Sequence, residues 1–310
     1  MTARTSAAAA TMTVELAGPL DIGASVEFLR RNGDDLMDRW DGTRLVRVLT
    51  LGGRRVAVSM RPLGCPTMPR LLVTVEPRAG QHITAEALHD AVAAQFLPAD
   101  ASWDHLLALD RRLAAVAATA PAIRPLGLTD PLYSLIRAIT AQQVNLRFAT
   151  TIRSRLAQSF GVRLKVDGSE AYVLEPDTLA GTSVAELRRL QLSERKASYL
   201  IGVAAAVADR RIDRCQLSRL ETEELVQIMS RLHGVGRWTA EWFAARVLLR
   251  PVVVAGDIGV RKAVGRLYDA GMPSEDEVRR LTAHWQDAAL IAQQLVLETC
   301  AGHLDKVTAE

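Results

Sequence analysis

The first hundred residues contain short apolar runs of the kind that form β-strands. Four runs, rich in β-branched residues and partly alternating between apolar and polar positions, predict half-exposed antiparallel strands; they are TMTVELAG (11–18), TRLVRVLTL (43–51), RRVAVSM (54–60) and PRLLVTVEP (69–77). Gly52-Gly53, between two of these runs, is typical of a tight hairpin. Segments 22–31 and 84–96 have the pattern of two helices packed on this sheet. This part of the chain is therefore predicted to be α+β.

From about residue 101 onward the pattern is almost wholly helical. Apolar residues at i, i+3 and i+4 predict helices over 103–120, over a long segment from 131 to its closing Gly161, over 194–209 and over 221–232. Stretches containing Gly and Pro, at 121–130 and 162–183, are interpreted as breaks between helices. The predicted organisation is a flexible tail (1–11), an α+β domain (12–100) and a mainly helical core (101–310).

The composition is that of a soluble globular protein, with 49% hydrophobic and 24% charged residues among 310. No run of about 18 uncharged apolar residues is present, which argues against a membrane span. Residues 1–11 lack an apolar segment, so they are interpreted as a tail and not a signal peptide. Cys65, Cys215 and Cys300 are far apart and without a Cys or His cluster, which argues against disulfides, zinc and iron–sulfur sites. We expect a cytoplasmic protein without a metal.

Positive charge is concentrated in one segment near the C-terminus. The net charge of the whole chain is only +3, but seven basic residues and two acidic ones lie between Arg231 and Arg266. A solvated helix face and a nucleic-acid surface both account for this excess.

A Gly-x-Gly turn in this basic segment separates two predicted helices. The sequence Leu-His-Gly-Val-Gly-Arg-Trp-Thr-Ala runs from Leu232 to Ala240, and the second helix begins directly after the turn. The two glycines permit left-handed backbone, and the free amides at the start of the second helix favour a phosphate. An ordinary connection between helices is the alternative interpretation.

Asp257 follows the second helix and precedes another predicted helix, IGVRKAVGRLY (258–268). It is suited to cap that helix by accepting hydrogen bonds from its free amides. It is equally suited to present an ionised carboxylate at the mouth of a basic surface. The two interpretations are compatible.

Together, LHGVGRWTAEWFAAR (232–246) and VVVAGDIGVRKAVGRLY (252–268) resemble the helix-hairpin-helix, loop and aspartate of the helix-hairpin-helix DNA glycosylase superfamily. Within it, the chain resembles the bacterial 3-methyladenine DNA glycosylases of type II. The resemblance extends over about residues 12–300 and places the helix-hairpin-helix at about 221–250. It implies a small antiparallel sheet domain followed by a helical glycosylase core.

The resemblance implies that Asp257 is the catalytic carboxylate. Cleavage of an N-glycosidic bond forms an oxocarbenium-like sugar cation, which a carboxylate stabilises while it orients a water molecule. Trp238 occupies the position of the Schiff-base lysine of bifunctional relatives, so hydrolysis without lyase chemistry is implied. The chain also lacks the cysteine quartet of the iron–sulfur members.

Further residues match the family's substrate pocket, wedge and backbone contacts. The pocket aromatics are Trp238, Trp242 and Phe28, which would stack on a flipped cationic purine; core packing is the alternative role. Gln143 matches the wedge, where the close family pattern has leucine, and Gln142 matches a family glutamine; both also suit a polar surface turn. The DNA-backbone contacts are Gly234, Val235, Gly236, Arg237 and Thr239. The hairpin carbonyls of the family can also hold a monovalent cation.

One stretch departs from the family pattern. Residues 286–290 read Gln-Asp-Ala-Ala-Leu, without the aromatic residues and arginine of the family, so a more open pocket is expected; Asp287 is interpreted as a surface charge. The predicted function is excision of alkylated purines from damaged double-stranded DNA by a monomer associated with the nucleoid. The alternatives are a glycosylase for hypoxanthine or an oxidised base and a catalytically silent DNA-binding protein.

Overall fold

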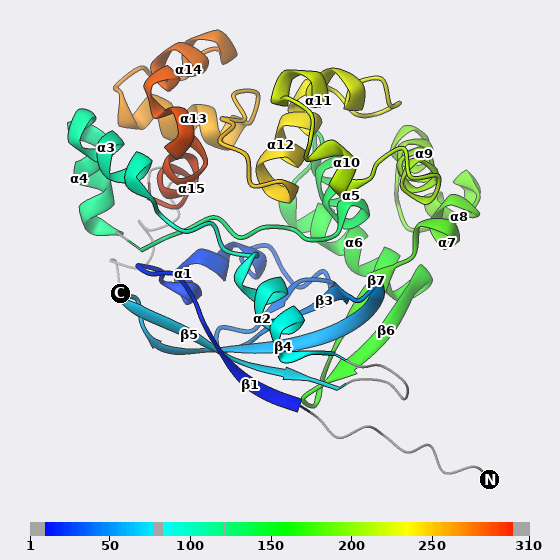
Figure 1. The fold of residues 1–310 in the computed structure, drawn as a ribbon. Helices are drawn as coiled ribbons and strands as arrows, with labels where there is room; N and C mark the ends of the chain where they lie inside the picture. The colour runs from blue at the N-terminus through cyan, green and yellow to red at the C-terminus, as the bar shows by residue number, and fades with distance from the viewer. Residues whose placement is uncertain (1–9, 77–82, 121, 300–310) are drawn as a thin grey trace.

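In the computed structural model, described over residues 10–76, 83–120 and 122–299, a small antiparallel sheet lies below a larger body of helices (Figure 1). The sheet has the strand order β1-β5-β4-β3-β2. Its strands are β1 (Ala10–Glu15), β2 (Arg39–Trp40), β3 (Leu45–Leu51), β4 (Arg54–Cys65) and β5 (Met68–Val75). The four predicted antiparallel strands are confirmed, but β3 is buried on both faces and not half-exposed as predicted, because a second hairpin covers its other face. The two-residue β2 is too short to leave a periodic signal. The predicted tail (1–11) is two residues too long, because residues 10 and 11 belong to β1 and pair with β5. Residues 1–9 of the tail and residue 77 of the fourth predicted strand lie outside the described residues.

Apolar contacts cover both faces of this sheet. On β3, Leu45 and Leu49 belong to the cluster formed with α1 (Ile22–Val26) and α2 (Ala85–Ala93), whereas Val46 and Val48 belong to a cluster on the opposite face. The opposite face packs on a second hairpin, β6 (Gly161–Val166) and β7 (Ser169–Leu174). The predicted helix over 22–31 is shorter than expected and continues only as the 3-10 helix η1 (Glu27–Leu29).

The β6–β7 hairpin corrects the interpretation of residues 162–183 as a simple break. Its turn is Asp167-Gly168, where both residues have positive φ, 50° and 68°, as a two-residue hairpin turn requires. An Asp-Gly pair between apolar residues is a strong hairpin signal, and it was overlooked because helices surround it.

The remaining helices divide into two groups, seen on opposite sides of the upper half of Figure 1. One hydrophobic cluster joins α5 (Pro131–Ala141), α6 (Leu146–Phe160), α7 (Pro176–Ala180), α8 (Val184–Arg189), α9 (Glu194–Ala208), α10 (Arg214–Leu217), α11 (Thr222–Met229) and α12 (Arg237–Val247). A second cluster joins α3 (Ala101–Leu109), α4 (Arg111–Thr119), α13 (Ile258–Leu267), α14 (Glu275–Leu281), the 3-10 helix η2 (Ala283–Ala288) and α15 (Ala289–Thr299). The predicted boundary near residue 100 falls just before α3.

Two helices predicted as continuous are each divided in two. Asp110 stands between α3 and α4, where its carboxylate accepts hydrogen bonds from the amides of Arg112 and Leu113 and so begins a new helix. The segment 131–161 is broken after α5 at Gln143, whose φ is +52°, and begins again at the N-cap Asn145. In both cases a capping side chain overrides the apolar periodicity on which the prediction rested.

A buried ion-pair network fastens the sheet domain to the helices. Asp35, only 3% exposed, lies between η1 and β2, and its Oδ2 accepts hydrogen bonds from Arg153 on α6 at 2.9 Å and from Tyr133 on α5 at 2.8 Å. Arg137 adds an ion pair at 3.2 Å. Burial alone would raise the pKa of Asp35, but the two guanidinium groups outweigh burial and hold this pKa below its ordinary value.

Candidate functional site

The Gly-x-Gly turn between α11 and α12 requires glycine at only one of its two glycine positions. Gly234 has a φ of +86°, and a Cβ there would overlap the ring of Tyr199 on α9. Gly236 has a φ of −92°, which any residue adopts, and a Cβ there would meet open space. Of the two glycines that permit left-handed backbone, only Gly234 adopts it. Gly234 is required for folding of the turn, whereas Gly236 leaves a space in front of α12.

The start of α12 presents backbone amides to that space. Gly236 is the N-cap residue, and within the described chain no side chain caps this helix. The amides of its first turn therefore lack intrahelical partners at the positive end of the helix dipole. The side chain of Arg237 is directed elsewhere, because it pairs with Glu223 at 2.8 Å and Glu241 at 2.9 Å. Only the backbone of Arg237 is thus placed for an anion.

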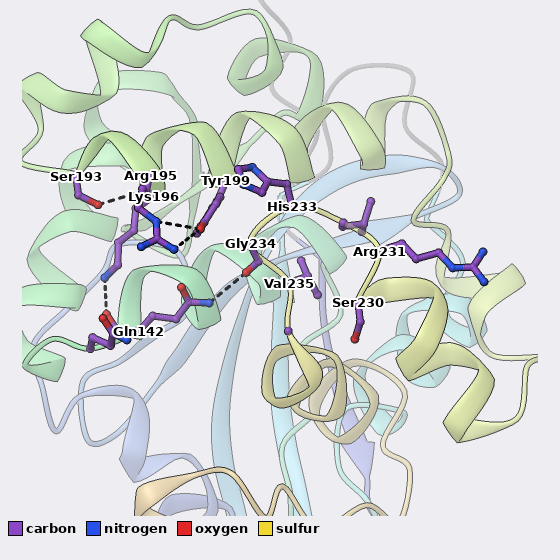
Figure 2. A pocket seen from close by; sticks show the side chains of 13 residues that line it. Gln142, Ser193, Arg195, Lys196, Tyr199, Ser230, Arg231, His233, Gly234 and Val235 are labelled. Atoms are coloured by element: carbon purple, nitrogen blue, oxygen red, sulfur yellow. Dashed lines mark hydrogen bonds between the residues drawn. The ribbon is translucent and has the colours of Figure 1, made fainter.

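A polar groove of about 610 Å³ runs between this turn and the N-terminus of α9. Figure 2 shows that side chains from both elements point toward it. Basic groups line it through Arg195, Lys196 and Arg231, and Gln142 and Gln143 close it on the side of α5. The groove brings together the predicted backbone-contact segment and the predicted wedge.

The two predicted wedge glutamines have different roles in this groove. The Gln142 side-chain amide donates to the carbonyl of Gly234 at 3.2 Å (Figure 2). It also lies 3.4 Å from the hydroxyl of buried Thr239. Gln143 is exposed. Gln142 therefore fastens the loop after α5 to the turn, and only Gln143 is free to reach a duplex. A monovalent cation at the hairpin carbonyls, which stays a prediction, would share the Gly234 oxygen with Gln142.

Exposed apolar side chains next to Gln143 were not singled out from the sequence. Val144, Leu146 and Phe148 are 36%, 53% and 40% exposed, respectively. Together they form an exposed apolar surface that runs from Gln143 along the start of α6. A single continuous helix was predicted over this segment, and its apolar residues were expected to form one buried stripe.

Asp257 stands at the junction of the two helical groups. As N-cap of α13, its Oδ1 accepts a hydrogen bond from the amide of Val260 at 3.1 Å. Its Oδ2 accepts one from the indole Nε1 of Trp238 on α12 at 3.4 Å. Gly259 makes room for this arrangement, since a Cβ there would lie 2.9 Å from Oδ1. The predicted capping geometry is present, and it leaves Oδ2 directed toward Trp238.

The predicted pocket tryptophans are half-buried on one face of α12. Trp238 and Trp242 pack against a cluster that contains Ala245, Val254 and Leu290. Leu290 belongs to the stretch that lacks aromatic residues. Its fully buried aliphatic side chain is therefore what this stretch places against the two tryptophans. Asp287 is exposed.

Phe28 reaches the same region from the sheet domain. It is half-buried, and the guanidinium groups of Arg137 and Arg246 lie 5.8 Å and 5.7 Å from its ring centroid. Arg246 is four residues after Trp242 and therefore on the same face of α12. Its Nη1 is buried and has no hydrogen-bond partner within the described residues, and burial lowers the pKa of this guanidinium. Sequence reasoning missed Arg246, although the i, i+4, i+8 spacing from Trp238 indicates it.

Much of the positive charge between Arg231 and Arg266 is used inside the protein. Arg250 donates to the carbonyls of Leu217, Ser218 and Leu220, and Arg261 donates to the carbonyl of Pro273. Arg237 is held in ion pairs and Arg246 lies over the Phe28 ring, so the excess charge is weaker evidence for a nucleic-acid surface than its count suggests.

The described residues were compared with the patterns of a metal site and of a membrane-spanning helix. Among them, no group of three or more His, Cys, Asp or Glu side chains is arranged to hold a metal ion. None of the helices in the same ranges has the length and apolar character needed to cross a membrane.

Comparisons with known proteins relate part of the chain to DNA repair proteins. A family model described as "HhH-GPD superfamily base excision DNA repair protein" matches residues 136–287. The chain is 24% identical over 168 residues to a DNA-3-methyladenine glycosylase of Bacillus subtilis (53% of this chain, 55% of that one). It is 29% identical over 136 residues to DNA-3-methyladenine glycosylase 2 of Escherichia coli (43% and 47%). It thus spans about half the length of these curated relatives.

The fold as a whole also has a solved counterpart. A 3-methyladenine DNA-glycosylase from Archaeoglobus fulgidus superposes with a TM-score of 0.79 at 23% identity, covering 93% of this chain and 98% of the other. At this identity the likeness concerns the fold, and it includes the sheet domain that the family model leaves out.

Proposed function

We propose that the chain, whose residues 136–287 match the HhH-GPD superfamily of base excision DNA repair proteins, is a monofunctional DNA glycosylase acting on alkylated purines such as 3-methyladenine. Its proposed partner is damaged double-stranded DNA. The observation that carries the proposal is the placement of Asp257 against Trp238, at a helix N-terminus between the two helical groups. Similarity to relatives named DNA-3-methyladenine glycosylases supports the choice of substrate.

In the proposed reaction, water attacks C1′ of the sugar and the base leaves with the electrons of the glycosidic bond. Asp257 stabilises the positive charge that develops on the sugar and orients the water. The indole of Trp238 donates to Oδ2 and so keeps the carboxylate in position beside the flipped base. Since position 238 holds no amine, the products are a free base and an intact abasic site.

Substrate binding in this proposal uses the backbone of the turn. The free amides that open α12 would hold a phosphate without reading sequence, and Gln143 would fill the space left by the extruded nucleotide. The groove with Arg195 and Arg231 lies beside this contact and provides further positive charge.

Replacing Gly236 by Val should weaken binding to damaged and undamaged duplexes alike, because phosphate contacts carry no sequence information. We expect a loss of roughly tenfold, equivalent to about 1.4 kcal/mol, measured by fluorescence anisotropy at several salt concentrations. Gly236 is chosen because its Cβ would enter open space, so the turn should still fold. A loss confined to damaged DNA would place Gly236 in the base pocket instead.

Arg246 favours a second candidate function, excision of a neutral lesion such as hypoxanthine. Its buried Nη1 lacks a partner within the described residues, and it lies on the Trp238 face of α12. A guanidinium in this position would donate to an oxygen or nitrogen of a neutral base and repel a cationic one.

A panel of duplexes, each with one defined lesion, tests both functions. Single-turnover release of 3-methyladenine, 7-methylguanine, hypoxanthine and 8-oxoguanine is measured, and the product is examined for strand breaks before and after alkali. We expect the alkylated purines to be released and the strand to break only after alkali. Preferred release of hypoxanthine would establish the second candidate. A covalent adduct trapped with borohydride would contradict monofunctional hydrolysis.

A further inference from the structure

Lys196 on α9 binds the end of α5 in the groove described above. Its Nζ donates to the carbonyl oxygen of Gln142 at 2.7 Å (Figure 2). It also donates to the carbonyl oxygen of Thr140 at 3.0 Å. Carbonyls at the C-terminus of a helix have no intrahelical partners and carry the negative end of its dipole. Lys196 is therefore the cation that caps α5, supplied by a helix distant in sequence.

Backbone carbonyls, and not a carboxylate, are the partners of this ammonium group. Lys196 is partly buried and forms no ion pair with any residue in the described ranges, and burial lowers its pKa. A charged donor gives strong and directional hydrogen bonds to carbonyl oxygens. The position of Lys196 is thus explained by the two carbonyls that it orients.

One of these carbonyls controls the conformation of the next residue. The Gln142 oxygen belongs to the peptide plane that joins Gln142 to Gln143. Gln143 has a φ of +52°, a conformation that costs a residue other than glycine free energy and persists only when the surroundings enforce it. Lys196 holds this peptide plane in place by donating a hydrogen bond to the Gln142 carbonyl oxygen. The side chain of Gln142 is in turn held by its hydrogen bond to the carbonyl of Gly234.

We propose that Lys196 is the positioning residue for the DNA wedge: by holding the Gln142 carbonyl, it directs Gln143 out of the groove toward the duplex. This inference rests on the proposed glycosylase function and concerns base extrusion, before any bond is broken. Lys196 itself is not a catalytic residue.

The test compares one lesion in two contexts. A paired lesion must be unstacked and unpaired before it can be excised, and the wedge offsets this cost; a lesion in single-stranded DNA carries little of the cost. Lys196→Met should therefore lower single-turnover excision from the paired duplex by about tenfold or more relative to single-stranded DNA, or about 1.4 kcal/mol. Because this is a ratio of rates measured on one preparation, it does not depend on the fraction of active protein.

Three further variants sharpen the result. Lys196→Arg retains a cationic donor and should restore most of the ratio. Lys165→Met removes the same charge from an exposed position on β6 and should leave the ratio unchanged. Gln143→Ala should lower the ratio as Lys196→Met does, and the double variant should lose little more than either single one, because both changes disable the same step.

Equal losses on paired and single-stranded DNA, an unchanged ratio, or fully additive effects of Lys196→Met and Gln143→Ala would overturn the positioning role. Failure of the unaltered protein to excise any lesion from either DNA would instead refute the proposed function. The two failures are therefore distinguishable.

Discussion

Asp257→Asn is expected to leave DNA binding intact and to lower the rate of base release by about 10²–10³-fold. Asparagine retains an oxygen that can cap α13 by accepting from Val260, so the local fold should persist. What it lacks is the negative charge that stabilises the sugar cation. Single-turnover excision of 7-methylguanine and anisotropy with a duplex carrying an abasic-site analogue measure the two properties separately.

A matched control for this variant is Asp287→Asn. Asp287 is exposed in η2, and its interpretation as a surface charge predicts unchanged excision. Full activity of Asp257→Asn would remove Asp257 from catalysis and leave it only its role as helix cap. Loss of activity together with loss of secondary structure, measured by circular dichroism, would show that the cap is what matters.

The sheet strands were predicted well because they are short apolar runs rich in β-branched residues, and a glycine turn joins two of them. Gly52-Gly53, with φ values of 56° and 75°, forms the expected hairpin turn. Asp167-Gly168 is a local signal for the β6–β7 hairpin itself. The packing of this hairpin on a sheet formed more than a hundred residues earlier leaves no such local trace in the sequence.

The sequence indicates where the residues of the candidate site lie along the chain, but not which side chains contact one another. Asp257 and Trp238 are separated by a helix and a loop, yet the structure brings them within hydrogen-bond distance. By contrast, the pairing of Arg237 with Glu223 and Glu241, and the attachment of Gln142 to the turn, depend on how helices pack. Spacing along one helix identifies a shared face, but it does not show which residue from another element meets that face.

The buried network at Asp35 predicts a large effect on stability. Asp35→Asn is expected to lower the free energy of unfolding by about 3–5 kcal/mol, because it leaves the guanidinium groups of Arg137 and Arg153 without their counter-charge in a buried site. Urea unfolding followed by tryptophan fluorescence measures this loss. Asp34→Asn is the control: Asp34 is one residue away, its side chain is 44% exposed, and its ion pair with Arg39 should contribute at most about 1 kcal/mol.

The same network predicts how stability depends on pH. Because the pKa of Asp35 is lower in the folded protein than the ordinary value of 3.8, its contribution is fully present above that value. The contribution is lost as the pH falls through the folded-state pKa, since the folded protein must then take up a proton at Asp35. The difference in unfolding free energy between wild type and Asp35→Asn should thus be constant near neutral pH and shrink below about pH 4. A difference that stays constant down to pH 2.5, or that is no larger than that of Asp34→Asn at pH 7, would show that the charge of Asp35 does not hold the sheet domain to α5 and α6.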